Sequence, residues 1–230
     1  MNMNVLAVGD LHGRDCWKKI NPEEHDRIVF TGDYADSFDI FPEKILENLN
    51  SVIEFKKQFP GKVTLLLGNH DIQYAEYPHY RCSGFDRFFQ PDYTRLFTEN
   101  KELFQVGAQF GGYLFTHAGL SNSFARNSLH NHYSSIINKE IDVADLLNQI
   151  HQSQDQPLLH AISIYRGGAA AFGGITWADY RETVVDLLPG YDQVVGHAPQ
   201  TKITKVEGDN SSITYIDVLG TKEEFLVLKI

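Results

Sequence analysis

The chain has 230 residues, 42% hydrophobic and 22% charged, so we expect one soluble globular domain over residues 1–230. Its formal net charge of −10 disfavours nucleic acid and anionic membrane surfaces as partners, and no apolar run is long enough to span a membrane. The N-terminus lacks the pattern of a signal peptide, and two cysteines, Cys16 and Cys82, are too few for a disulfide framework, so we expect a cytoplasmic protein with free thiols.

Three short apolar segments in the first third of the chain predict buried strands. They cover residues 4–8, 27–31 and 63–67, and each is apolar on both faces. Between the second and the third, apolar residues recur at helical spacing, so we predict a helix that begins near Pro42 and ends before Pro60. The order strand, helix, strand is typical of a largely parallel sheet.

An aromatic-rich segment follows at residues 73–100, with eight aromatic side chains and several arginines. These aromatic residues could form a wall that faces a substrate. They could instead belong to a small insertion with its own core, and we favour this second interpretation.

The remaining elements continue the alternation of strands and helices. We predict a strand at residues 113–116, an amphipathic helix at 143–150 and a further strand at 193–195. Two terminal segments, residues 212–217 and 225–230, are expected to pair with each other as strands.

Polar residues gather where five of these strands end. Each loop there combines small residues with Asp, Asn or His. The loops are Gly9-Asp10-Leu11-His12-Gly13, Gly32-Asp33-Tyr34-Ala35-Asp36, Gly68-Asn69-His70-Asp71, His117-Ala118-Gly119 and Gly196-His197. One such pair is typical of an ordinary turn. Five in order indicate a single site, because sites in open α/β sheets form where loops at the carboxyl ends of strands converge.

The side chains of these loops predict a centre for two divalent metal ions. Carboxylate, imidazole and amide oxygen suit manganese, iron or zinc, and manganese is the ion we expect in vitro. Asp33 has enough oxygens to bridge two ions. The predicted ligands are Asp10, His12 and Asp33 for one ion, with Asn69, His117 and His197 completing the other.

Together the five loops resemble those of the calcineurin-like metallophosphoesterases, particularly the phosphoprotein phosphatase branch, whose pattern is GDxHG, GDxxDRG, GNH[DE], HGG and GH. The resemblance implies an α/β fold, a four-layer α/β/β/α β-sandwich with flanking helices. It implies hydrolysis of phosphate monoesters by in-line attack of a hydroxide that bridges the two metals, with phosphoserine or phosphothreonine proteins or small phosphorylated metabolites as substrates. It also implies that His70 is the general acid and that Asp36 orients it, while Asp217 is structural.

One departure from the pattern affects phosphate binding. Ser37 stands where the family has an arginine, so one phosphate contact is missing. Arg166 and Arg181 are the candidates to replace it, because a guanidinium matches phosphate oxygens bidentately. We favour Arg166, which precedes the flexible pair Gly167-Gly168.

Two other functions remain open. Residues 173–177, Gly-Gly-Ile-Thr-Trp, resemble a segment of bacterial diadenosine tetraphosphatases, so symmetrical hydrolysis of a dinucleoside tetraphosphate is an alternative. A scaffold that binds metal without turnover is another, supported only by Ser37. The presence of both Asp36 and His70 argues against it. Six histidines match no motif and are expected to be solvated or structural: His25, His79, His130, His132, His151 and His160.

Overall fold

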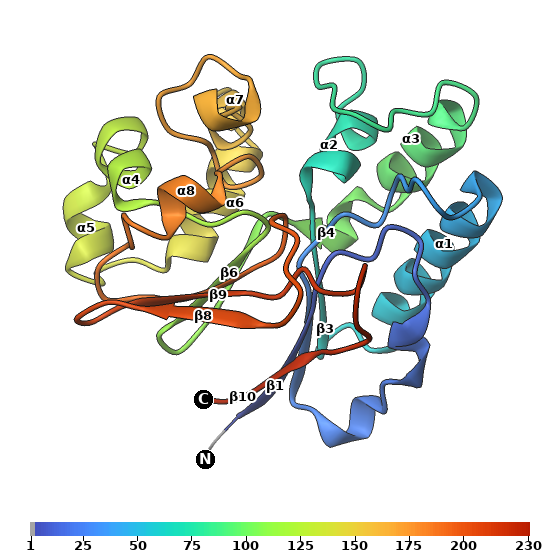
Figure 1. Cartoon of the computed structure of the whole chain (residues 1–230), viewed down its shortest axis with the longest axis horizontal. Helices are drawn as coiled ribbons and strands as arrows, with labels where there is room; N and C mark the ends of the chain where they lie inside the picture. The colour runs from blue at the N-terminus through green and yellow to red at the C-terminus, as the bar shows by residue number, and fades with distance from the viewer. Residues whose placement is uncertain (1–2) are drawn as a thin grey trace.

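The computed structural model describes residues 3–230, which form two five-stranded sheets between two groups of helices (Figure 1). The first sheet has the strand order β10-β1-β2-β3-β4, in which β1 to β4 are parallel and β10 is antiparallel to β1. Its strands are β1 (Asn4–Val8), β2 (Arg27–Phe30), β3 (Val63–Leu66), β4 (Phe104–Gln105) and β10 (Leu226–Lys229).

The second sheet has the order β5-β6-β7-β9-β8. Here β6, β7 and β9 are parallel, and an antiparallel strand closes each edge. Its strands are β5 (Gly107–Phe110), β6 (Tyr113–Thr116), β7 (Asp192–Val195), β8 (Thr204–Glu207) and β9 (Ser212–Tyr215).

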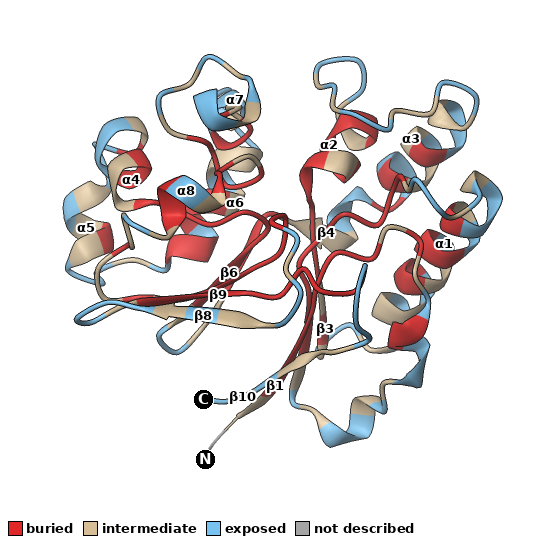
Figure 2. Ribbon diagram, viewed as in Figure 1, coloured by how far each residue is buried: buried red, intermediate tan, exposed pale blue. Residues whose placement is uncertain are grey.

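Side-chain alternation along β1 explains the layers. Val5 and Ala7 pack in one cluster with Phe115 and Val194 of the second sheet, which makes this cluster the core between the sheets. Alternate residues such as Leu6 belong to a larger cluster that includes the apolar face of helix α1 (Pro42–Gln58). Since successive side chains of a strand point to opposite faces, β1 is buried on both sides (Figure 2).

Helices cover the outer face of each sheet. In Figure 1, α1, α2 and α3 lie on one side of the molecule and α4 to α8 on the other. The remaining helices are α2 (Asn69–Ala75), α3 (Gln90–Glu99), α4 (Asn122–Ser128), α5 (Tyr133–Ile137), α6 (Val143–His151), α7 (Gln156–Leu159) and α8 (Tyr180–Thr183), with short 3₁₀ helices at Cys16–Lys19, Pro22–Glu24, Lys101–Leu103 and Ile164–Arg166. Within residues 3–230, no helix combines the length and apolar character that crossing a membrane requires.

The predicted four-layer α/β/β/α fold is confirmed, as are the strands and the two long helices expected from periodicity. The predicted pairing of the two terminal segments is wrong. Strand β9 pairs with β7 and β8, whereas β10 pairs with β1 in the other sheet, with Asn4 opposite Lys229. The apolar pattern of a segment identifies it as a strand. Which strand it pairs with depends on the tertiary fold, which the residues of the segment alone do not specify.

The aromatic segment 73–100 also differs from the expectation of a separate core. Tyr74 and Tyr93 are fully buried members of the main cluster, and their rings lie 4.6 Å apart. Phe85 stacks on Tyr74 at 5.3 Å, while Phe88 is 88% exposed. The segment, which includes α3, therefore extends the main core beside α1. A few aromatic rings bury more area against the existing core than against each other.

Candidate metal and phosphate site

The five polar loops converge on one cavity of about 430 Å³. The predicted ligands that line it are Asp10, His12, Asp33, Asn69 and His197. The sixth, His117, is fully buried and lies within 3.4 Å of Asp33 and 3.1 Å of His197. Loops at the carboxyl ends of β1, β2, β3, β6 and β7 supply these six residues, so both sheets contribute to the site.

Asp33 lies at the centre of the cluster. Its Oδ2 is 3.7 Å from His12 Nε2 and 3.4 Å from His117 Nε2, and its Oδ1 accepts a hydrogen bond from the backbone N–H of His70. A Cβ on Gly68 would come within 2.1 Å of Oδ1, so only glycine permits this approach. One carboxylate oxygen thus faces two imidazoles, which is the position that a ligand shared by two ions would need.

Hydrogen-bond acceptors meet around His117. Its Nδ1 donates to the Thr31 carbonyl at 2.9 Å, which leaves Nε2 facing Asn69 Oδ1 at 3.0 Å and His197 Nδ1 at 3.1 Å. Among residues 3–230, the buried Nε2 of His197 has no hydrogen-bond partner. Buried polar atoms normally have a hydrogen-bond partner. The lone pairs of Asn69 and His197 that meet here are therefore better suited to binding a cation than to hydrogen bonding with one another.

The charges of the cluster also favour a bound cation. Burial raises the pKa of Asp10 well above its ordinary value, and the nearby Asp217 carboxylate raises it further. Burial lowers the pKa of His117, but Asp33 and Asp10 more than offset this effect and bring it to about 9. The Asp33 and Asp10 carboxylates therefore favour positive charge at this point of the cluster, which a divalent cation would supply.

The two predicted ligand sets are not assembled equally well. Among the described residues, three groups have ligand atoms all within 4.8 Å of one another: His12 with Asp33 and His70, Asp33 with His117 and His197, and Asp36 with His70 and Cys82. Asp10 belongs to none of them, and its Oδ2 accepts a hydrogen bond from the His197 backbone at 2.8 Å. The set that contains Asp10 is thus looser than the set around His117.

His70 and Asp36 form the hydrogen-bonded pair that the sequence predicted. His70 Nδ1 lies 2.8 Å from Asp36 Oδ2, and Asp36 also accepts from Tyr74 Oη at 2.5 Å and from Gln73. Burial lowers the pKa of His70, but Asp33 and Asp36 raise it to about 12. The Asp33 and Asp36 carboxylates therefore favour the protonated form of this imidazole. Cys82 Sγ lies 3.6 Å from His70 Nδ1, a contact that the sequence did not predict.

Asp71 holds two of the loops together, which sequence reasoning missed. Its buried carboxylate accepts backbone N–H groups from Asp33, Tyr34 and Ala35 and from Gly68. These bonds stabilise the left-handed backbone of Asp33, which has φ of 53°. The position of Asp71 three residues after Gly68 at the start of α2 was the only local sign of such a role.

The two candidate arginines occupy different places. Arg166 lines the cavity, and its Nε lies 2.8 Å from Asp179 Oδ2 as an ion pair. Arg181 is 60% exposed and, within the described chain, is not among the residues lining the cavity. Arg181 donates to Asp179 at 2.7 Å and to the Tyr165 carbonyl at 2.8 Å, so it holds the segment that carries Arg166.

The cavity lining also includes residues that were not predicted as ligands or catalytic groups, among them Trp177, Asp217 and Arg14. The Trp177 ring lies 5.8 Å from the His197 ring in an edge-on arrangement. Asp217, expected to be structural, lines the same cavity. Arg14 enters it from the loop after β1.

Most of the chain matches a known family. The sequence model for the calcineurin-like phosphoesterases matches residues 3–219, so the chain belongs to this family. It is accordingly a metallophosphoesterase, a hydrolase that acts on phosphoester bonds. The family depends on two metal ions, and the Asp and His clusters described above could hold them. Comparison with curated proteins found no match.

Two solved structures are similar to this chain at low sequence identity. A cold-active protein-tyrosine phosphatase of a psychrophilic Shewanella species is 18% identical, with a TM-score of 0.60 over 98% of this chain and 75% of that chain. A protein serine/threonine phosphatase from Saccharomyces cerevisiae is 17% identical, with a TM-score of 0.46 over 93% of this chain and 67% of that chain. The Shewanella structure supports the two-sheet fold described above.

Proposed function

We propose that this protein hydrolyses phosphate monoesters with two divalent cations bound in the cavity. Asp33 would be shared by both ions. The ligand sets would be Asp10, His12 and Asp33 for one ion, and Asp33, Asn69, His117 and His197 for the other. When bound, the ions would offset phosphate charge and lower the pKa of a coordinated water.

The residues of this chain supply the rest of the chemistry. The observation that carries the proposal is the position of Asp33 Oδ2 between two imidazoles, on the cavity that His70 also lines. Protonated His70 would donate a proton from Nε2 to the departing oxygen. Asp36 would keep Nδ1 protonated and fix the ring, as an orienting carboxylate does.

Hydrolysis of p-nitrophenyl phosphate with added Mn²⁺ tests the proposal. We expect turnover that depends on the metal and stops with a chelator. A protein that binds Mn²⁺ without turnover would instead be a scaffold. For the physiological class, the panel would contain phosphoserine, phosphothreonine and phosphotyrosine peptides, the last because the Shewanella protein bears that name. Proteins and small metabolites are both candidate substrates.

A second candidate is symmetrical hydrolysis of dinucleoside tetraphosphates. Trp177, from the segment 173–177, presents an aromatic ring on the cavity wall beside His197, where a nucleobase could stack. Diadenosine tetraphosphate in the same panel separates the two candidates. A kcat/KM at least tenfold above that of the best phosphopeptide would favour the nucleotide, and the reverse ratio would favour the monoester.

A further inference from the structure

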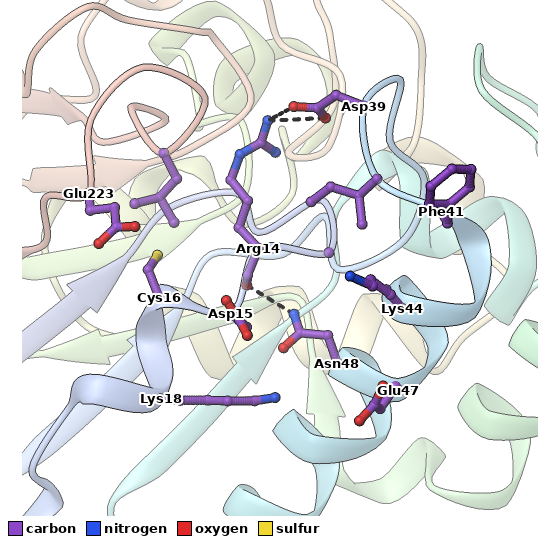
Figure 3. Close-up of a pocket in the computed structure, with 13 residues that line it drawn as sticks. Arg14, Asp15, Cys16, Lys18, Asp39, Phe41, Lys44, Glu47, Asn48 and Glu223 are labelled. Atoms are coloured by element: carbon purple, nitrogen blue, oxygen red, sulfur yellow. Dashed lines mark hydrogen bonds and ion pairs between the residues drawn. The ribbon is translucent and has the colours of Figure 1, made fainter.

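Arg14 is a basic residue of the cavity that the sequence motifs did not single out. It lies two positions after His12, and it lines both the site cavity and an adjoining cavity of about 680 Å³. Its Nη2 lies 3.1 Å and 3.3 Å from the two carboxylate oxygens of Asp39 (Figure 3). The guanidinium is therefore held at the boundary between the two cavities.

The loop that carries Asp39 is the loop that lacks the expected arginine. Ser37 Oγ donates to Asp39 Oδ1 at 2.6 Å, so Ser37 orients the carboxylate that in turn orients Arg14. The Ser37 hydrogen bond and the Arg14 charge lower the pKa of Asp39, which keeps it ionised at neutral pH. Where the family pattern has an arginine, this chain thus has a serine that helps to position an arginine from a neighbouring loop.

The backbone beneath Arg14 is firmly held. The Arg14 carbonyl accepts a hydrogen bond from Asn48 Nδ2 at 3.0 Å, and Asn48 Oδ1 accepts one from Trp17 Nε1 at 3.0 Å. Asn48 and Trp17 are both buried. Figure 3 shows the Arg14 side chain extending from this held backbone toward Asp39. Because its backbone and its guanidinium are already held in place, Arg14 would lose less conformational entropy on binding an anion.

Fold stability alone does not account for this arrangement. The Asp39 side chain is 65% exposed, and exposed ion pairs stabilise proteins by only about 0–1 kcal/mol. Arg14 Nη2 donates to Asp39, and Nη1 makes one long contact of 3.4 Å with the Leu11 carbonyl. The guanidinium therefore has N–H donors left for another oxygen ligand.

We propose that Arg14 binds the non-bridging oxygens of the substrate phosphate, with Asp39 as its positioning residue. This inference rests on the proposed phosphoesterase function. Arg14 reaches the cavity beside Asp39, whereas Arg166 reaches it from the segment bound to Asp179. A phosphate between them would meet two guanidinium groups supplied by different loops, and the adjoining cavity would leave space for the rest of the substrate.

Binding of inorganic phosphate to the Mn²⁺-loaded protein, measured by calorimetry, tests the assignment without requiring turnover. Arg14→Ala should weaken phosphate binding by about 10- to 100-fold, as loss of a charge-assisted contact predicts, while the affinity for Mn²⁺ and the melting temperature stay unchanged. The matched control is Arg95→Ala, which also removes an arginine that pairs with acidic residues, but at an exposed position on α3. Phosphate affinity within twofold of wild type in Arg14→Ala would overturn the assignment, as would an equal loss in the control.

Asp39→Ala tests the positioning role. It should weaken phosphate binding less than Arg14→Ala does, and it should add nothing in the Arg14→Ala background, because Asp39 acts only through Arg14. An additive further loss would contradict this role. Kinetics separates this inference from the proposed function. If phosphate affinity depends on Arg14 but the protein shows no turnover, only the proposed function is overturned. If the protein turns over substrate, and Arg14→Ala changes neither KM nor inhibition by phosphate, only the role of Arg14 is overturned.

Discussion

The His70 imidazole receives its properties from three neighbouring side chains. Asp36 accepts from Nδ1, and Asp36 is itself held by Tyr74 and Gln73 from the same short helix as His70. This network fixes the ring of His70, which lines the cavity. An acid held this way matters most for substrates whose leaving oxygen cannot depart as an anion.

We therefore expect His70→Asn to lower kcat for phenyl phosphate by about 10²- to 10⁴-fold, and to lower it far less for a substrate with a good leaving group. Affinity for Mn²⁺ should be retained, since the six proposed ligands remain. Steady-state kinetics on both substrates and calorimetry with Mn²⁺ measure these effects. His79→Asn, an exposed substitution of the same type, is the control. Full activity of His70→Asn on phenyl phosphate would refute the acid role.

At the scale of elements, the site depends on loops in which backbones approach side chains closely. A Cβ on Gly196 would come within 1.9 Å of Asp10 Oδ1. The next residue, His197, has φ of 63° and donates its backbone N–H to Asp10. The loop after β7 is thus locked to the loop after β1, and glycine is required at their contact.

Gly196→Ala should push these two loops apart and weaken Mn²⁺ binding by about 10- to 100-fold, as loss of support around a metal ligand usually does. Calorimetry with Mn²⁺ measures the change. Gly61→Ala is the matched control, because a Cβ there would meet no atom of the described chain within 4 Å. We expect that variant to bind Mn²⁺ like wild type, and equal losses in the two variants would count against a specific role for Gly196.

A pair of histidines, His151 and the buried His160, lies at the ends of helices α6 and α7. His160 Nδ1 lies 2.9 Å from Thr176 Oγ1, and His160 Nε2 lies 3.4 Å from His151 Nδ1 at the end of α6. Burial lowers the pKa of His151 to about 4, and burial together with His151 lowers that of His160 to about 3. Both rings therefore stay neutral in the folded protein at pH values where the unfolded chain protonates them.

The low pKa values of these two histidines make the stability of the fold depend on pH. Below the ordinary histidine pKa of 6.5 the unfolded state takes up protons that the folded pair does not, so the pair destabilises the fold as pH falls from about 6.5 toward 4. His160→Gln should therefore show a smaller drop in its urea midpoint between pH 7.5 and 5 than wild type does. His79→Gln, at an exposed position, should keep the full drop. Identical drops in all three proteins would exclude the pair as the cause.

At the scale of the whole molecule, the proposed ligands come from both halves of the sandwich. Asp10, Asp33 and Asn69 follow strands of the first sheet, whereas His117 and His197 follow strands of the second. Bound ions would therefore connect the two sheets at one edge, in addition to the apolar core between them. Metal binding should be coupled to the stability of the entire fold.

Saturating Mn²⁺ should raise the melting temperature. At 100 times Kd, a ligand specific to the folded state adds about 2.7 kcal/mol, which for a chain of this size corresponds to roughly 5–10 °C. Asp33→Asn should lose most of this shift, because it removes the shared ligand, whereas His70→Asn should keep it. Differential scanning calorimetry with and without Mn²⁺ gives the comparison. A full shift in Asp33→Asn would argue against a shared role for Asp33.

The sequence by itself determined the strands, the main helices, the fold class and the five polar loops. Hydrophobic periodicity is local, so residues 4–8 and 42–58 can be recognised without knowing their neighbours. The spacing of Asp10 and His12, and the family resemblance that paired Asp36 with His70, also predicted which side chains share the cavity. The metal-binding and catalytic roles of these residues stay predictions that the experiments above address.

Only the tertiary structure decided the rest. The partner of β10, the burial of Tyr74 and Tyr93 in the main core, and the bonds from Asp71 to a distant loop all depend on contacts between residues far apart in the chain. The same holds for Arg14, whose place in the cavity depends on Asp39 from another loop. Spacing along the chain does not specify such contacts, because they arise from how the sheets pack and where each loop then comes to lie.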